Sequence, residues 1–393
     1  MSLRESFFRH VAQTSPEPLA LELVKAEGAT VIDSGGRKYY DLISGIAVSN
    51  LGHGNIKIIE AIKRQADDYL HLMVYGEFVE SPQVLLAEKL AQLLPPSLSS
   101  CYFVNSGTEA VEGAIKLSRR YTGRNEIVSF RNSYHGSSTG ALSIGGNEAL
   151  KNAFRPLMPC VRILEFNSFT DLDQITSETA AVFIEPIQGE AGIILPEKNF
   201  LQLLRKKCTE TGALLVFDEI QTAMGRTGKL FCFEHENVIP DILLLSKAFG
   251  GGMPLGAFIS SVEIMTSLSR NPALGHITTF GGHPVCCAAS LAAMLQLTET
   301  TIMDAADSKE KLFRKKLQHP LISEIRGKGL FLSLQFPGEE MNRKIIKRCV
   351  EKGVLVDWFL FAPASMRIAP PLIITEEEIV ASCDIILESL NEI

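Results

Sequence analysis

Short apolar runs alternate with longer amphipathic stretches through the middle of the chain. Residues 180–184, 213–217 and 242–246 are almost entirely apolar. Between the first two runs, residues 199–211 carry apolar side chains at helical spacing, and Gly212 follows as a helix-ending residue. Continuous apolar runs separated by helices are typical of a parallel sheet that is covered on both faces. We therefore expect an α/β fold here.

A charged residue follows each of these apolar runs. Glu185, Asp218 and Lys247 stand at the three predicted carboxyl ends, where parallel sheets bind their ligands. Burial lowers the pKa of an ammonium group, and a partly neutral lysine is a nucleophile toward carbonyls. Lys247 is therefore a candidate Schiff-base lysine, and the glycines at 250–252 would allow a ligand to approach closely. The alternative is a lysine at a strand end that reaches solvent.

A candidate anion site precedes this region. Residues 101–104 read as a strand that runs through Asn105-Ser-Gly-Thr-Glu into a helix. Ser106 and Glu109 have the spacing of a capping box. Free amides and hydroxyls at a helix N-terminus bind anions, so Ser106, Gly107 and Thr108 could hold a phosphate. A capped helix that binds no ligand is the alternative.

The two ends of the chain are less uniform than the middle. The elements expected there are a small antiparallel piece within residues 1–50, one half-exposed strand over 325–336, and helices over 342–352 and 376–390. This organisation predicts a large α/β domain over residues 51–299. A smaller α+β domain would combine residues 1–50 with residues 300–393.

Composition narrows the class of protein. The chain has 393 residues, of which 46% are hydrophobic and 21% charged, and its net charge is −7, as in ordinary soluble proteins. It carries no Lys/Arg block, so a nucleic-acid partner is not expected. It also shows no apolar run of transmembrane length and no signal-peptide pattern, so no membrane association is expected. The eight cysteines form no Cys-x-x-Cys pair, which argues against a metal site or disulfide framework and favours the cytoplasm.

A series of short motifs extends these observations over nearly the whole chain. In order, they are Leu51-Gly-His-Gly, Asn105-Ser-Gly-Thr-Glu-Ala, Tyr134-His-Gly, Glu185-Pro-Ile-Gln-Gly-Glu, Phe217-Asp-Glu-Ile-Gln-Thr, Gly225-Arg-Thr-Gly, Ser246-Lys-Ala-Phe-Gly-Gly-Gly, Thr278-Thr-Phe-Gly-Gly and Arg326-Gly-Lys-Gly. The ordered set resembles the class III (omega) aminotransferases, which use pyridoxal 5'-phosphate, and is most similar to the acetylornithine/ornithine aminotransferase subgroup. The resemblance implies fold type I, with a mostly parallel seven-stranded sheet in the large domain and a smaller α+β domain.

The resemblance also implies roles for the candidate residues. Lys247 would bind the cofactor covalently and transfer protons, and Asp218 would pair with the pyridine nitrogen. Thr279 would reach the phosphate bound by a neighbouring subunit, which implies a homodimer with shared active sites. The other expected cofactor contacts are Ser106, Gly107 and Thr108 at the phosphate, Tyr134 on the ring face, and His135, Glu185 and Gln221 around the ring.

Two further residues match the family's substrate contacts. Arg367 corresponds to the arginine that holds the carboxylate of 2-oxoglutarate, the expected amino acceptor. A guanidinium suits this task because it can bind a carboxylate through two parallel hydrogen bonds. Glu190 corresponds to the glutamate that pairs with this arginine when an omega-amine occupies the site.

The contacts to the amino donor depart from the family pattern. Ser137 stands where acetylornithine and ornithine enzymes usually carry an arginine, and Thr14 and Ile46 stand where ornithine enzymes place tyrosines. Arg131 could substitute for the missing arginine, or it could be a solvated charge at a strand end. The donor therefore remains open among acetylornithine, ornithine, lysine, 4-aminobutyrate and other omega-amines.

Other functions remain compatible with the same scaffold. An aminomutase or a decarboxylase would use the same cofactor, although the Thr278 motif favours the aminotransferase pattern. A non-catalytic protein that binds pyridoxal phosphate is disfavoured because Lys247, Asp218 and Thr108 are all present. A nucleotide-binding function is not expected, since the chain lacks the glycine-rich turns that cradle nucleotide phosphates.

Overall fold

A seven-stranded sheet forms the centre of the larger part of the molecule. The computed structural model describes residues 2–393. The strand order is β4-β10-β9-β8-β7-β5-β6, and only β10 runs antiparallel to its neighbours. The strands are β4 (Ser100–Val104), β5 (Glu126–Phe130), β6 (Val161–Leu164), β7 (Thr179–Ile184), β8 (Leu214–Asp218), β9 (Ile242–Leu245) and β10 (Gly256–Ser260). The predicted α/β fold with a mostly parallel sheet is confirmed.

Helices cover both faces of this sheet. Val216 packs in a core cluster with α5 (Gly107–Thr122), whereas Leu215 packs in a second cluster with α8 (Phe200–Thr211). Every residue of β8 is buried, which explains its continuous apolar sequence. The other helices of this part are α3 (Ile56–Asp68), α4 (Ser81–Leu93), α6 (Thr139–Ile144), α7 (Glu148–Lys151), α9 (Val262–Thr266) and α10 (Pro284–Glu299), with 3-10 helices at Asn152–Phe154, Asp171–Gln174, Cys232–His235, Lys247–Gly250 and Ser267–Ser269.

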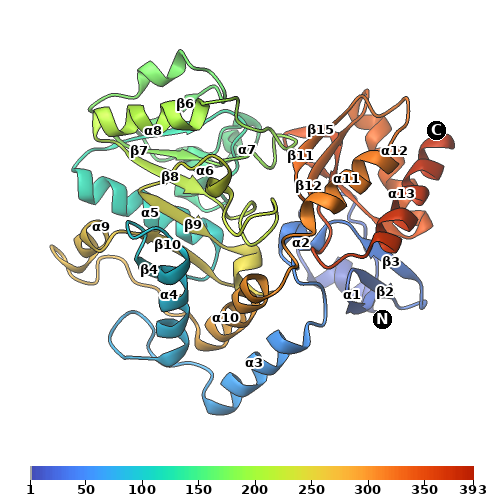
Figure 1. Cartoon of the computed structure of the whole chain (residues 1–393), viewed down its shortest axis with the longest axis horizontal. Coiled ribbons are helices and arrows are strands. Elements are labelled where there is room, and N and C mark those ends of the chain that lie inside the picture. The colour runs from blue at the N-terminus through green and yellow to red at the C-terminus, as the bar shows by residue number, and fades with distance from the viewer. Residues whose placement is uncertain (1) are drawn as a thin grey trace.

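The two ends of the chain come together in a smaller lobe, on the right of Figure 1. β3 of the N-terminal segment pairs in parallel with β13, which lies more than three hundred residues later in the chain. The elements are α1 (Leu3–His10), β1 (Leu23–Glu27), β2 (Thr30–Asp33), β3 (Lys38–Asp41), α2 (Ser44–Ala47), α11 (Ala306–Lys316), β11 (Glu324–Lys328), β12 (Phe331–Gln335), α12 (Glu339–Lys352), β13 (Val354–Leu355), β14 (Asp357–Phe359), β15 (Ala362–Ile368) and α13 (Glu376–Asn391). The antiparallel N-terminal piece and the two C-terminal helices are confirmed. The domain boundaries at residues 50 and 299 stay a prediction.

The strand expected over residues 325–336 is wrong as a single element. The structure has a hairpin of β11 and β12, with Glu324 paired to Gln335 and Lys328 to Phe331. Gly329 makes the turn with a φ of 63°, and a Cβ there would lie 2.7 Å from the backbone carbon of Thr227. Only glycine adopts a left-handed conformation this close to another backbone without a clash. Gly329 therefore allows the chain to reverse between β11 and β12.

Arg226 links the two lobes from a fully buried position. Its Nη1 donates to the carbonyl oxygens of Leu330, at 2.8 Å, and Pro370, at 2.6 Å. Its Nη2 donates to the side-chain oxygen of Asn50. The Gly225-Arg-Thr-Gly motif therefore ties a loop of the large lobe to three segments of the small lobe. One of these segments begins just after β15, the strand that carries Arg367.

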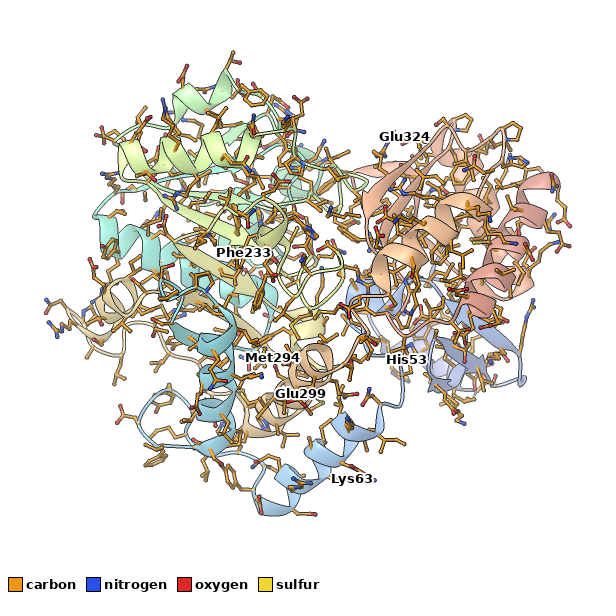
Figure 2. All side chains as sticks on the ribbon, viewed as in Figure 1. His53, Lys63, Phe233, Met294, Glu299 and Glu324 are labelled. Carbon is orange, nitrogen blue, oxygen red and sulfur yellow. The ribbon has the colours of Figure 1, made fainter. Side chains whose placement is uncertain are left out.

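Side chains fill both lobes, as Figure 2 shows. His53 lies where the chain leaves the small lobe for α3, and its Nε2 is 2.8 Å from a carboxylate oxygen of the buried Asp41. None of the helices within residues 2–393 combines the length and the apolar character that a membrane-spanning helix needs.

Candidate active site

The carboxyl ends of β7, β8 and β9 meet at a cavity of about 290 Å³. The N-terminus of α5 and the segment after β5 complete its wall. The cavity is lined by Gly107, Thr108, Tyr134, His135, Gly136, Ser137, Glu185, Asp218, Ile220, Gln221, Thr222, Ser246 and Lys247. The structure thus brings together most of the site residues expected from the sequence.

Lys247 is the first residue of the 3-10 helix that follows β9. It has a φ of 51°, a left-handed conformation that is costly for a residue with a Cβ and is typical of functional sites. Burial lowers the pKa of Lys247 from its ordinary value; the carboxylate of Glu190 opposes this effect and the guanidinium of Arg367 adds to it. A partly desolvated amine in this environment has the nucleophilic character that the sequence predicts.

Asp218 ends β8 and is almost fully buried. Its Oδ2 lies 2.7 Å from Nδ1 of His135, and its Oδ1 accepts a hydrogen bond of 3.1 Å from the backbone amide of Ile220. Burial disfavours the charged imidazole of His135, but the hydrogen bond and charge of Asp218 outweigh this effect, so the pKa of His135 is raised. Behind the ring, Ser129 Oγ lies 3.4 Å from His135 Nε2. These contacts fix the orientation of the carboxylate at the cavity.

Glu185 holds the loops around the cavity rather than standing free within it. Its two carboxylate oxygens accept hydrogen bonds of 3.1 Å from the backbone amides of Tyr134 and Gly189. Burial raises the pKa of Glu185 to about 7, against the lowering effect of His135. The Tyr134 hydroxyl in turn lies 3.2 Å from Ser137 Oγ. Glu185 therefore positions the segment that carries Tyr134 and Ser137.

The N-terminus of α5 faces the same cavity. Ser106 is its N-cap, and its Oγ accepts from the amide of Glu109 at 3.3 Å. A capping box also requires a hydrogen bond from the Ser106 backbone amide to the Glu109 carboxylate, and this part of the prediction is wrong. The Glu109 carboxylate accepts from the backbone and side-chain amides of Asn105 instead. Thr108 Oγ1 lies 2.5 Å from the hydroxyl of Ser138, at the edge of the cavity. An anion at this terminus would meet backbone amides and a hydroxyl.

Arg367 and Glu190 form a buried ion pair beside this site. Arg367 Nη2 donates to both carboxylate oxygens of Glu190, at 2.8 and 2.9 Å, although the two residues are 177 positions apart. The guanidinium carbon lies 4.6 Å from the centroid of the Phe359 ring. The Leu360 amide donates to Glu190 Oε2 at 3.1 Å. The guanidinium is thus held in place from several sides.

Four residues that the sequence singled out lie away from the cavity. Thr279 is exposed, and its carbonyl oxygen lies 2.8 Å from Nε2 of His71. Arg131 forms an exposed ion pair with Glu165, which matches the interpretation as a solvated charge. Thr14 and Ile46 are exposed as well. Asp357 lies 3.5 Å from Arg367, but it belongs to no recognisable motif and was not predicted from the sequence.

The residues present fit pyridoxal phosphate. The side-chain nitrogen of Gln221 is buried and has no hydrogen-bond partner within residues 2–393, so it has a donor to offer to a ligand. A Cβ on Gly136 would lie 2.4 Å from Thr108 Oγ1, so glycine keeps the anion end of the cavity open. A lysine for an aldehyde, a carboxylate for a ring nitrogen and a helix N-terminus for a phosphate are the groups that this cofactor needs. No cluster of metal-binding side chains occurs in the described part of the chain.

Comparison with known proteins decides the family. The model of the class III aminotransferase family matches residues 11–390, which is nearly the whole chain. The chain belongs to the class III aminotransferase family. It is therefore an aminotransferase of fold type I, and pyridoxal 5'-phosphate is its cofactor.

The chain is similar to named proteins and to a solved structure over most of its length. It is 39% identical to an acetylornithine aminotransferase of Methanocaldococcus jannaschii, over 95% of this chain and 94% of the relative. It is also 39% identical to an acetylornithine aminotransferase of Methanopyrus kandleri, over 91% of each chain. The crystal structure of the ornithine aminotransferase of Toxoplasma gondii ME49 matches with a TM-score of 0.91 and 29% identity, covering 100% of this chain and 96% of that one.

Proposed function

We propose that this aminotransferase transfers an amino group from an amine or amino acid donor to 2-oxoglutarate. Acetylornithine, ornithine, lysine and 4-aminobutyrate are the candidate donors. The observation that carries the proposal is the single cavity in which Lys247 and Asp218 meet, with the Arg367–Glu190 pair beside it. The two relatives named acetylornithine aminotransferase support a donor of this chemical type.

Lys247 would act on both the cofactor and the substrate carbon. Pyridoxal phosphate supplies an electron sink for negative charge at that carbon when it is bound. The desolvated amine of Lys247 would remove the proton from the substrate carbon as a general base and return a proton as a general acid. Asp218, oriented by His135, would keep the ring nitrogen protonated. The hydroxyl of Thr108 and the amides at the start of α5 would hold the phosphate.

Arg367 and Glu190 would distinguish the two half-reactions. When an omega-amine occupies the site, Glu190 neutralises the guanidinium, as in the observed pair. When 2-oxoglutarate enters, its carboxylate would replace that of Glu190 on Arg367. The guanidinium would then be paired with a carboxylate in each half-reaction and would never be an unpaired buried charge.

Ser137 leaves the selection of the donor open. It is an exposed residue on the cavity wall, and its uncharged hydroxyl can donate one hydrogen bond to a donor carboxylate but cannot form an ion pair with it. An arginine would instead bind the carboxylate through two parallel hydrogen bonds and with a full positive charge. We therefore propose a broader choice of donor than an enzyme with arginine at this position would have, with Tyr134 and Ser137 forming one wall of the donor site.

We further propose a homodimer that works in the cytoplasm. Thr279 is exposed and lies outside the cavity of its own chain, as expected if it reaches a partner's phosphate. Phe78, Val79, Ile277 and Phe280 are also strongly exposed apolar residues. A second subunit would bury them.

The proposed function predicts a two-step spectral reaction. The purified protein, loaded with pyridoxal phosphate, is mixed with each candidate donor in the absence of an acceptor. We expect loss of the absorbance of the lysine-bound cofactor, with one equivalent of oxo product per active site. Addition of 2-oxoglutarate should then restore the absorbance and yield glutamate. Release of carbon dioxide without formation of glutamate would contradict transamination and favour a decarboxylase.

A further inference from the structure

Arg367 lies between two carboxylates, of which only one belongs to the expected pair. Glu190 accepts both of its hydrogen bonds from Nη2. Oδ1 of Asp357 lies 3.5 Å from Nε of the same guanidinium, on another of its edges. Arg367 is 1% exposed, so its guanidinium is shielded from water, whereas the Asp357 side chain is 23% exposed.

The backbone fixes the position of Asp357. β14 and β15 are antiparallel, and Asp357 is the residue directly opposite Arg367 in their register. Side chains of directly opposed residues project from the same face of a sheet and lie side by side. Asp357 and Arg367 therefore share one rigid element, whereas Glu190 comes from a loop of the large lobe that follows β7.

Unused hydrogen-bonding capacity is concentrated at this contact. Nε and Nη1 of Arg367 and Oδ1 of Asp357 are all buried and lack hydrogen-bond partners within the described chain. Buried polar atoms without partners are uncommon, because they lose their hydrogen bonds to water without gaining others. The separation of 3.5 Å is slightly longer than a hydrogen bond, so a shift of a few tenths of an ångström would form a charge-assisted bond between Nε and Oδ1.

We propose that Asp357 is a positioning residue for the acceptor half-reaction, which holds the Nε edge of Arg367 when an acceptor carboxylate replaces Glu190 on Nη2. This inference rests on the function proposed above. The acceptor carboxylate removes the contact of the guanidinium with Glu190. Without Asp357, no other carboxylate of the chain would then orient the guanidinium. Burial raises the pKa of Asp357 to about 6, with Arg367 opposing the effect, so the carboxylate is ionised at pH 8.

A simple electrostatic account makes the opposite prediction. If Asp357 only neutralised part of the charge of Arg367, its removal would strengthen the attraction between the guanidinium and the acceptor carboxylate. Loss of Asp357 would weaken acceptor binding if Asp357 positions Arg367, and would strengthen it if Asp357 only neutralises charge. The affinity for the acceptor therefore distinguishes the two roles.

The test compares Asp357→Asn with the wild type at pH 8 in separate half-reactions, each followed by cofactor absorbance. We expect the KM for 2-oxoglutarate to rise about tenfold, the effect of losing one charge-assisted hydrogen bond. The KM for an aldehyde acceptor without a carboxylate, and the rate with an omega-amine donor, should stay within about twofold because neither uses Arg367. Ser333→Ala is the matched control, since Ser333 lies opposite Arg367 on the other neighbouring strand and is an uncharged, buried residue.

The KM values of Asp357→Asn decide whether Asp357 positions Arg367. An unchanged or lower KM for 2-oxoglutarate in Asp357→Asn would overturn the positioning role. An equal rise in KM for the aldehyde would show a general structural defect and overturn it as well. If the wild type fails to form glutamate from 2-oxoglutarate, the proposed function itself fails. In the same assay, Arg367→Gln should impair the 2-oxoglutarate reaction more strongly than Asp357→Asn does.

Discussion

Replacement of Lys247 by alanine is expected to abolish transamination and covalent binding of the cofactor. We propose two tasks for this side chain, the attachment of the cofactor and the transfer of the proton at the substrate carbon. Loss of a general acid–base group alone lowers a rate by about 10²–10⁴-fold. We therefore expect a loss of kcat of at least this size, measured as glutamate formation, and disappearance of the absorbance of the lysine-bound cofactor.

Lys198→Ala is the control for this experiment. Lys198 is exposed and lies in the loop before α8, so its loss should leave both activity and absorbance unchanged. Turnover at the wild-type rate in Lys247→Ala would refute the assignment of the catalytic lysine.

Replacement of Asp218 by asparagine is expected to separate attachment of the cofactor from catalysis. Asparagine has nearly the same shape and can still accept a hydrogen bond from His135 Nδ1, but it carries no charge to keep the ring nitrogen protonated. Removal of one preorganised electrostatic contact of this kind costs on the order of 10²–10³-fold in kcat. The cofactor should stay bound to Lys247, and only the conversion by the donor should slow, as stopped-flow absorbance would show.

Asp241→Asn provides the matched control. Asp241 immediately precedes β9, at the opposite end of the strand from Lys247, and it pairs with Arg205 and the amide of Leu215. Its replacement can weaken the fold but should leave the rate per bound cofactor within about twofold. A similar loss of kcat in both variants would mean that the Asp218 effect is structural.

The site at the sheet edge could be predicted because its signals are local. Each apolar run is a strand, and Glu185, Asp218 and Lys247 each stand at the end of one. Parallel strands bring such ends together whatever the details of packing. The α/β fold and the meeting of these three side chains therefore followed from hydrophobic pattern alone, and the ordered motifs added the family.

The rest depended on contacts that local patterns do not contain. Alternating hydrophobicity continues from β11 into β12, so only the position of Gly329 against the Thr227 backbone reveals the turn. The contact of Asp357 with Arg367 arises from the register of β14 and β15. The carboxylate of Glu109 could bind either of two neighbouring amides, and the sequence does not distinguish between them.

The lysine that binds the cofactor can be identified by chemical mapping. The wild-type protein, loaded with pyridoxal phosphate, is treated with borohydride, which reduces a lysine–cofactor imine to a stable amine. Proteolysis and mass spectrometry then locate the added mass. We expect one modified residue, Lys247, and no labelling when an amino donor has first converted the cofactor. Labelling of another lysine, or no labelling of the loaded protein, would contradict this expectation.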